Sequence, residues 1–215
     1  AGDYYDDYWS EAGFCPPRNG NGFIEAQVRR FATPGTKIAD LGCGDGRTIG
    51  GRVLQSGASY VGVDLSRSAN RRALDLGLDA RLVSDIGETG LDDAEFDVVF
   101  IVEVLEHLLS PVAALEEARR ILKPGGSVVV TVPNSAVWPR RAELLLLGRP
   151  NAMGDPLSRS QPWRDPHIRM FTMRSLGDLL ASVGFASVEV SGTEPMSPRF
   201  AGSVVLRWPT LFARR

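Results

Sequence analysis

Short apolar runs alternate with segments whose apolar positions recur every three or four residues. The apolar runs predict strands at residues 37–41, 60–64, 80–83, 96–102, 127–132 and 186–190. The intervening patterns predict helices at residues 24–31, 47–56, 68–76, 112–122 and 172–183. The run at 96–102 is almost entirely apolar, as expected for a strand covered on both faces. This alternation predicts an α/β fold with a doubly wound, mostly parallel sheet and helices on both faces.

Two segments interrupt the alternation. Residues 1–35 precede the first strand and predict an N-terminal arm with a helical cap, and residues 36–215 then form the main domain. Residues 134–171 are rich in Pro, Trp and Arg, and a loop of that length is uncommon unless it is functional. We therefore expect a lid or substrate-side insertion after the fifth strand. The tail predicts a helix at 200–207 and then the start of a last strand, which the pattern leaves incomplete.

Length and composition narrow the class of protein. The chain has 215 residues, of which 43% are hydrophobic and 23% charged, and this excludes a disordered, fibrous or disulfide-rich chain. Its two cysteines, Cys15 and Cys43, define no disulfide framework. No apolar run approaches the length of a membrane helix, and the acidic, aromatic N-terminus does not resemble a signal peptide. A cytoplasmic protein is the expectation.

Charge is distributed unevenly along the chain. The net charge of −2 gives no electrostatic case for nucleic-acid binding. Residues 139–215, however, hold 11 arginines and six acidic residues, so the first part of the chain is acidic and the last part basic. Either the arginines occupy solvated faces, or they form a cap over an acidic substrate.

The turn between the first strand and the next helix carries the main chemical signal. Its sequence is Asp40-Leu41-Gly42-Cys43-Gly44-Asp45-Gly46. Glycines at alternate positions let a backbone turn tightly and approach a ligand, and ligands of open α/β sheets bind beyond the carboxyl ends of the strands. Asp64 ends the second strand, 18 residues after Gly46, where an acid can accept hydrogen bonds from ribose hydroxyls. The pair predicts a nucleoside ligand.

Two other nucleotide-binding patterns fit poorly. The dinucleotide fingerprint G-x-G-x-x-G/A would place its third small residue at position 47, which is Arg47. Asp40 at the strand end also disfavours a pyrophosphate. A Walker-type loop is excluded because no Gly-Lys-Ser/Thr follows the turn.

With these residues in view, the sequence resembles the class I S-adenosylmethionine-dependent methyltransferases. Residues 40–46 resemble the first family motif and Val63-Asp64 the second. The later motifs follow in order at residues 95–99, 103–108, 122–126 and 132–134. The resemblance covers residues 36–191, implies a Rossmann-like fold, and is strongest to the small-molecule branch that includes ubiquinone-type O-methyltransferases and relatives in natural-product and glycan pathways.

The resemblance implies roles for individual positions. Asp40 and the backbone of Gly42, Cys43, Gly44 and Gly46 would hold the methionine end of S-adenosylmethionine, and Asp64 would hold its ribose. The adenine would meet Asp85 at its amino group and Leu65 and Ile86 on its faces, while Val102 and Glu103 would lie near the sulfonium. The product would be S-adenosylhomocysteine.

Glu103, Glu106 and His107 are spaced so that they share one face if this stretch is helical. Three interpretations stay open: a structural network, a catalytic base or substrate contact, and a divalent metal site, which is possible but not favoured. The other histidine, His167, follows the insertion and is either a loop residue or a second catalytic histidine facing His107 across the site.

The arm and the insertion carry the remaining candidate groups. Tyr4, Tyr5, Tyr8 and Trp9, beside Asp6 and Asp7, predict either surface packing or an arm that closes over the site. The insertion holds Trp138 and Trp163 with Arg140, Arg141, Arg149, Arg159 and Arg164, which suit an aromatic or anionic acceptor.

The sequence therefore favours methyl transfer to a small molecule, with an oxygen acceptor preferred over nitrogen or carbon. Val102-Glu103-Val104-Leu105 stands where nucleic-acid amino methyltransferases carry an Asn/Asp-Pro-Pro-aromatic motif. The alternatives are a nicotinamide-dependent oxidoreductase, which Arg47 disfavours, and a cofactor-binding scaffold without methyl transfer or with another chemistry, because a fold does not settle function. The acceptor and the oligomeric state are left open.

Overall fold

The computed structural model describes residues 5, 6, 9, 22–136, 141, 144–146, 148, 166–192 and 209–214. Its strands are β1 (Lys37–Leu41), β2 (Ser59–Asp64), β3 (Ala80–Leu82), β4 (Phe96–Val102), β5 (Leu122–Thr131), β6 (Ala186–Gly192) and β7 (Pro209–Arg214). Its helices are α2 (Gly22–Phe31), α3 (Gly50–Val53), α4 (Arg67–Asp75), the 3-10 turn η1 (Leu105–His107), α5 (Pro111–Ile121) and α8 (Met173–Ser182).

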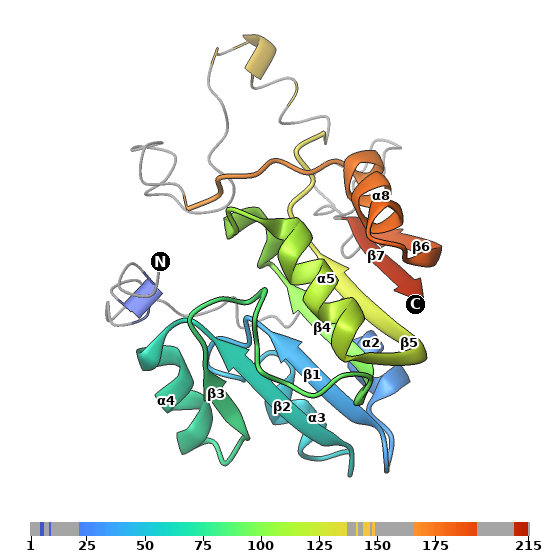
Figure 1. Ribbon diagram of the computed structural model, residues 1–215. Helices are drawn as coiled ribbons and strands as arrows, with labels where there is room; N and C mark the ends of the chain where they lie inside the picture. Colours follow the sequence, from blue (N-terminus) through green and yellow to red (C-terminus); the bar gives the residue numbers. More distant parts are fainter. Residues whose placement is uncertain are drawn as a thin grey trace.

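One seven-stranded sheet organises the molecule, with the strand order β3-β2-β1-β4-β5-β7-β6 (Figure 1). The first five strands of that order are parallel, and β7 pairs antiparallel with both β5 and β6. The order reverses between β1 and β4, where a doubly wound sheet opens a crevice at the carboxyl ends of its strands. The prediction of a Rossmann-like, mostly parallel sheet is confirmed.

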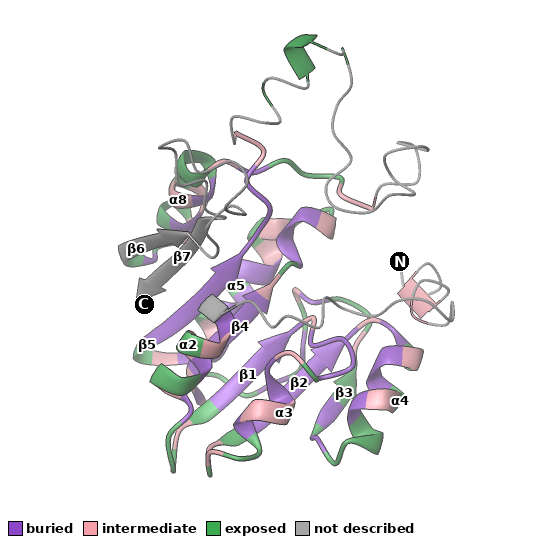
Figure 2. Ribbon diagram, turned by 180° about the vertical axis from the view of Figure 1, so that it is seen from behind, coloured by how far each residue is buried: buried purple, intermediate pink, exposed green. Residues whose placement is uncertain are grey.

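Alternating side chains of the strands build two hydrophobic layers, one on each face of the sheet. Val99, Ile101, Val128 and Val130 belong to the cluster that includes residues of α5 and α8. Val98, Phe100 and Val129 belong to the other, with residues of α2, α3 and α4. Figure 2 shows the central strands as buried between these helices. A strand covered on both faces must be apolar throughout, and this accounts for the continuous run at 96–102.

Two predicted boundaries were wrong in instructive ways. The helix expected at 47–56 is helical only over α3 and is flanked by turns. Gly50 and Gly51, both weak helix formers, make up half of this short helix, and Ile49 supplies no side-chain cap for it. The fifth strand begins at Leu122 rather than Ser127, directly after α5. Leu122 pairs with Phe96 before the register shifts, so the intervening Pro-Gly-Gly lies inside the strand as an irregularity.

The other helix ends follow their local signals. Ser110 accepts a hydrogen bond from the Ala113 amide and Pro111 occupies the first turn of α5. Thr172 and Ser175 form a capping box at the start of α8, and Gly184 follows its end with a φ of 92°.

The last strand and the ends of the insertion are also visible. β7 lies between β5 and β6 in the sheet, so the strand that the sequence left incomplete is present. The helix expected at 200–207 and most of the insertion lie outside the described residues. The two ends of the insertion meet where Asn134 and Phe171 form a parallel bridge and the Ser135 amide donates to the Phe171 carbonyl over 2.8 Å. The lid itself stays a prediction. Among the described residues, no helix is long and apolar enough to span a bilayer.

Candidate active site

The glycine-rich turn leaves β1 at the carboxyl edge of the sheet. Gly42, Gly44 and Gly46 have φ angles of 80°, 56° and 74°, a left-handed conformation that side chains with a Cβ disfavour. The amides of Gly42 and Cys43 both donate to the Val63 carbonyl, at 2.8 and 3.0 Å. The turn is thereby tied to the end of β2.

Close packing adds a second reason for glycine in this turn. A Cβ on Gly42 would overlap the Val104 side chain, and one on Gly46 would overlap Leu78. A Cβ on Gly44 would lie 2.7 Å from Trp9 of the N-terminal arm. The turn is thus surrounded by side chains from three other segments.

Asp64 connects this turn to the start of α4. One of its carboxylate oxygens accepts a hydrogen bond from the Gly44 amide at 2.7 Å, and the other accepts from the Ser66 amide at 2.8 Å. Burial raises the pKa of Asp64 despite these hydrogen bonds. The predicted ribose-binding carboxylate therefore also fixes the turn, and each oxygen keeps a lone pair for a ligand.

Asp40 has a partner that the sequence analysis did not identify. The Tyr60 hydroxyl of β2 donates a hydrogen bond to the Asp40 carboxylate over 2.9 Å, and both side chains are buried. Burial and the nearby Asp64 carboxylate raise the pKa of Asp40 to about 7, against the effect of this hydrogen bond. In the sequence the only signal was a hydroxyl-bearing residue in the strand next to β1, which does not reveal its partner.

The loop after β3 carries the residues predicted for adenine. Asp85 is exposed, and its carboxylate accepts a hydrogen bond from the Gly87 amide at 2.7 Å. Ile86 is buried in the hydrophobic cluster on the α5 face, and the half-buried Leu65 packs against that same cluster. These residues gather beyond the ends of β2 and β3.

The chain leaves β4 in a strained conformation. Glu103 has a φ of 55°, which is rare for a residue with a Cβ and is held here by hydrogen bonds from its amide to the carbonyl and the hydroxyl of Thr131. Surrounding protein atoms raise the pKa of the Glu103 carboxyl although its side chain stays open to water. Val102, just before it, is half-buried. Strain of this kind clusters at functional sites.

Both histidines of the chain meet at the carboxylate of Glu106. The rings of His107 and His167 stack with centroids 4.7 Å apart, and their Nε2 atoms lie 3.9 and 4.0 Å from the same Glu106 oxygen. Candidate ligand atoms of these three residues all lie within 4.8 Å of one another. The sequence grouped Glu103, Glu106 and His107. The structure instead brings Glu106 and His107 together with His167.

Glu106 is the most constrained member of this cluster. Its side chain is 1% exposed, and neither carboxylate oxygen has a hydrogen-bond partner among the residues that the structure describes. Burial and the neighbouring Glu103 carboxyl raise the pKa of Glu106 well above its ordinary range. A buried carboxyl without donors favours a proton or a cationic neighbour, and the two imidazoles are the basic groups beside it.

Residues 166–171, the return leg of the insertion, are bound to η1 by their backbone. The amides of Ile168 and Arg169 donate to the Glu106 carbonyl, each at 3.0 Å. His107 Nδ1 lies 3.1 Å from the Pro166 carbonyl, and because that carbonyl only accepts, Nδ1 carries the hydrogen. The Nε2 atom of neutral His107 is therefore the unprotonated, basic one.

Three residues of the N-terminal arm touch three parts of the site. Asp6 accepts hydrogen bonds from the Ser66 hydroxyl and the Ser68 amide at the start of α4, at 2.8 and 3.0 Å. Trp9 lies over Gly44, and the Tyr5 ring meets His107 edge-on with centroids 6.2 Å apart. Tyr4, Asp7 and Tyr8 lie outside the described residues, as do Trp138, Trp163, Arg140, Arg149, Arg159 and Arg164.

The charge of the site suits a cation. Asp40, Asp64 and Glu103 line one edge of the sheet; burial raises the pKa of Asp40 and of Asp64, and surrounding protein atoms raise that of Glu103. Mutual repulsion adds to this for Asp40 beside Asp64. A ligand with ammonium and sulfonium centres and ribose hydroxyls fits this set, whereas a pyrophosphate would increase the repulsion.

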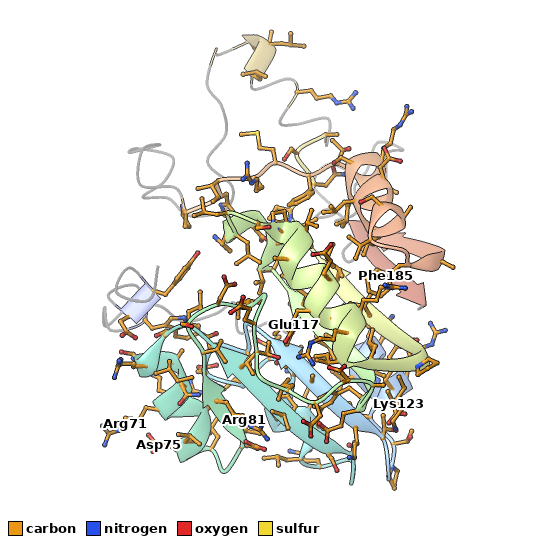
Figure 3. The ribbon with its side chains drawn as sticks, viewed as in Figure 1. Arg71, Asp75, Arg81, Glu117, Lys123 and Phe185 are labelled. Atoms are coloured by element: carbon orange, nitrogen blue, oxygen red, sulfur yellow. The ribbon has the colours of Figure 1, made fainter. Side chains whose placement is uncertain are left out.

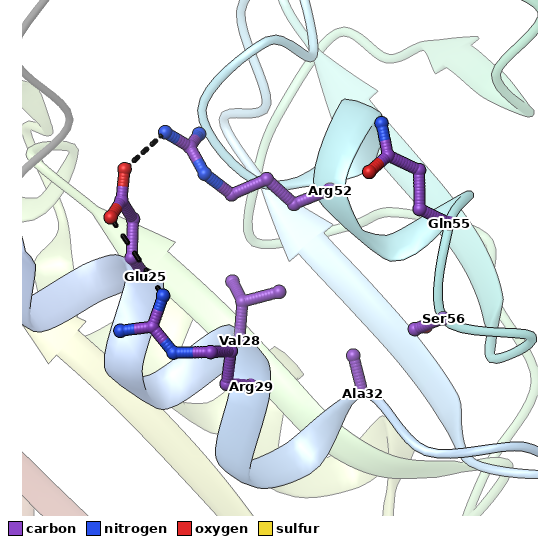
Figure 4. A pocket seen from close by; sticks show the side chains of 7 residues that line it. All are labelled: Glu25, Val28, Arg29, Ala32, Arg52, Gln55 and Ser56. Carbon is purple, nitrogen blue, oxygen red and sulfur yellow. Dashed lines mark hydrogen bonds and ion pairs between the residues drawn. The ribbon is translucent and has the colours of Figure 1, made fainter.

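A separate cavity of about 460 Å³ opens between α2 and α3 (Figure 4). It is lined by Glu25, Val28, Arg29, Ala32, Arg52, Gln55 and Ser56. Arg52 of α3 pairs with Glu25 of α2 at 2.8 Å, which links the two helices (Figure 4). None of the residues predicted for the site lines this cavity.

A glycine-rich turn at the point where the strand order reverses, with a carboxylate at the end of the second strand, is the arrangement typical of nucleoside-binding α/β proteins. Residues 39–130 match the family model described as a methyltransferase domain. These residues are similar to that family, and the fold and motifs of the chain resemble those of class I S-adenosylmethionine-dependent methyltransferases.

Known proteins place this assignment in context. The ubiquinone biosynthesis O-methyltransferase of Alkalilimnicola ehrlichii is 32% identical over 108 residues, which cover 46% of this chain and 42% of that protein. A similar ubiquinone biosynthesis O-methyltransferase of Azoarcus sp. is 35% identical, over 46% of this chain and 45% of that protein. The chain therefore spans less than half the length of these curated relatives.

Solved structures share the fold at low sequence identity. A Thermotoga maritima S-adenosylmethionine-dependent methyltransferase, named a possible histamine N-methyltransferase, has a TM-score of 0.67 at 20% identity, over 89% of this chain and 88% of that one. Phosphoethanolamine N-methyltransferase 2 of Haemonchus contortus, in complex with S-adenosyl-L-methionine, has a TM-score of 0.68 at 17% identity, over 99% of this chain and 56% of that one.

Proposed function

We propose that this chain transfers the methyl group of S-adenosylmethionine to an oxygen atom of a small molecule, such as a natural-product, quinone-like or sugar metabolite. The observation that carries the proposal is the pair of buried acids, Asp40 and Asp64, at the ends of β1 and β2, with the glycine-rich turn bound to Asp64 through the Gly44 amide. A cationic nucleoside relieves their repulsion. The names of the ubiquinone-type relatives support the choice of an oxygen acceptor.

Each residue then has a role in binding. Asp40, held by Tyr60, receives the ammonium group of the methionine end, and Asp64 accepts from the ribose hydroxyls. Asp85 receives the adenine amino group, and Leu65 and Ile86 pack on the ring. Val102 and Glu103 face the sulfonium, where the acid of Glu103 favours the cationic ground state.

When bound, S-adenosylmethionine supplies an already activated methyl group, so positioning and desolvation provide most of the acceleration. A hydroxyl acceptor also loses a proton. The cluster of Glu106, His107 and His167 provides the base, because it brings both imidazoles of the chain beside one carboxyl. Trp9 and Tyr5 of the arm exclude water from the glycine turn and the imidazoles.

Activity measured against a panel of candidate acceptors tests which class of acceptor the chain methylates. Phenols, catechols, sugar hydroxyls, carboxylic acids and primary amines are incubated with the chain and S-adenosylmethionine, and S-adenosylhomocysteine formation is measured. We expect turnover with an oxygen acceptor and loss of cofactor binding in Asp64→Ala. Turnover confined to amines would contradict the oxygen assignment.

Calorimetric titration tests the cofactor independently of the acceptor. We expect S-adenosylmethionine and S-adenosylhomocysteine to bind and NADH not to bind. Binding of NADH with no response to S-adenosylmethionine would overturn the proposal, and cofactor binding without turnover across the panel would point to a scaffold.

A further inference from the structure

The loop between β3 and β4, residues 83–95, has no helix or strand of its own. It nevertheless carries Asp85 and Ile86, the two residues proposed to meet adenine. Two side chains near the end of α5, Glu117 and Arg120, make hydrogen bonds to Thr89, Leu91 and Asp93 of this loop. A loop that is shaped from outside in this way depends on those side chains for its conformation.

Glu117 is the centre of this contact. Its side chain is 5% exposed and projects from α5 toward the loop (Figure 3). One carboxylate oxygen accepts hydrogen bonds from the Thr89 amide, at 2.8 Å, and from the Thr89 hydroxyl. The same hydroxyl accepts from the Leu91 amide at 3.2 Å. The carboxylate thus sets the turn of the chain at Thr89.

Arg120, one helical turn further along α5, completes the contact. Its guanidinium donates to both oxygens of Glu117 at 2.7 Å and to the Leu91 carbonyl at 2.7 Å. It also pairs with Asp93. Burial alone would raise the pKa of Glu117, but hydrogen bonds from Arg120 and Thr89 lower it, so the carboxylate is charged at neutral pH.

We propose that Glu117 is a positioning residue for adenine recognition: through Thr89 and Arg120 it holds the β3–β4 loop so that Asp85 and Ile86 are in place before the cofactor arrives. Gly87 supports this, because a Cβ there would lie 2.9 Å from that of Ala113 on α5, so the loop is seated directly on the helix. Ordering the loop in advance removes an entropic cost from binding.

This inference rests on the proposed function, so the test separates the two. Dissociation constants are measured by calorimetry for S-adenosylhomocysteine and for its deaminated analogue, in which hypoxanthine replaces adenine. Failure of the unmodified chain to bind S-adenosylhomocysteine would overturn the proposed function and this inference with it. We define the adenine selectivity as the ratio of the two dissociation constants, and we expect it to be about tenfold for one charge-assisted hydrogen bond. This ratio is then compared between the variants.

Glu117→Gln keeps the size of the side chain and removes its charge, and Glu116→Gln makes the same change at the neighbouring exposed position. We expect Glu117→Gln to lower the adenine selectivity at least about threefold, toward that of Asp85→Ala, and Glu116→Gln to leave it unchanged. In the Asp85→Ala background, Glu117→Gln should have no further effect on selectivity.

A purely structural role gives a different result. If Glu117→Gln weakens both ligands by the same factor, with selectivity intact, the inference is wrong. Binding stoichiometry reports the folded fraction, and Thr89→Val replaces Glu117→Gln if that variant does not fold. Thr89→Val removes the hydroxyl that links Glu117 to Leu91 and should also lower the selectivity.

Discussion

His107 and His167 stack with their ring centroids 4.7 Å apart and their ring planes 27° apart. They come from η1 and from the return leg of the insertion, which are distant in the sequence. Their shared neighbour is the buried carboxyl of Glu106. The sequence left His167 as either a loop residue or a second histidine across the site from His107, whereas the structure stacks the two rings on each other.

Substitution of either histidine should therefore lower turnover. We expect His107→Gln and His167→Gln each to reduce kcat by about 100-fold, as loss of a general base does, with the dissociation constant of S-adenosylhomocysteine unchanged. Steady-state kinetics and calorimetry on the same preparations measure the two effects. Unchanged kcat in both variants would eliminate histidine as the base.

Removal of divalent metal should not stop the reaction. The buried Glu106 carboxyl has the two histidines beside it as basic groups, and methyl transfer from a sulfonium needs no Lewis acid. We expect chelator-treated protein, with metal content checked by mass spectrometry, to keep its turnover. Loss of turnover on chelation, restored by magnesium alone, would contradict this expectation.

The fold was largely predictable because its signals are local. The apolar run at 96–102, the cap at Ser110 and the glycine after α8 each act within a few residues. The start of β5 was missed because Leu122 pairs with Phe96 on another strand. Pairing between strands decides that boundary, and a Pro-Gly-Gly sequence hides it.

The site was predictable only where one segment carries the whole signal. The glycine turn and Asp64 stand in the sequence as a motif, but their hydrogen bonds to each other do not. Tyr60 reaches Asp40 because β1 and β2 are adjacent, and His167 reaches Glu106 because the insertion returns to η1. Contacts of this kind depend on tertiary structure, and a single sequence carries no pattern for them.

Gly42 should tolerate alanine poorly for two separable reasons. Its φ of 80° strains any residue with a Cβ, and that Cβ would also overlap the Val104 side chain. We expect Gly42→Ala to lower the free energy of unfolding by about 2–4 kcal/mol, from backbone strain and overpacking together, and to weaken cofactor binding. Urea unfolding and calorimetry measure both.

Gly77 provides the matched control for that substitution. Its φ of 79° is nearly the same, but a Cβ there meets nothing within 4 Å. Gly77→Ala should therefore cost only the backbone strain, about 1 kcal/mol, and leave cofactor binding intact. Equal losses of stability in the two variants would show that the contact with Val104 is unimportant.

Asp40 should make the stability of the free protein depend on pH. Its pKa of about 7 in the folded chain lies above the ordinary 3.8. Between pH 3.8 and pH 7 the folded state therefore keeps a proton on Asp40 that the unfolded state has released. Stability from this group is present at low pH and is lost as pH rises toward 7. The loss between pH 5 and pH 8 is of order 2–3 kcal/mol.

Asp40→Asn isolates this contribution, because asparagine does not titrate and still accepts a hydrogen bond from Tyr60. The free energy of unfolding is measured by urea for both proteins at pH 5 and pH 8, so that other titrating groups cancel in the difference. We expect the variant to gain stability relative to the unmodified chain as the pH rises. The variant should also lose cofactor affinity, because the ammonium group then faces a neutral amide in place of a carboxylate. If the two proteins differ in stability by the same amount at pH 5 and pH 8, Asp40 is ionised at both and its pKa lies below 5. Other groups would then compensate for its burial beside Asp64.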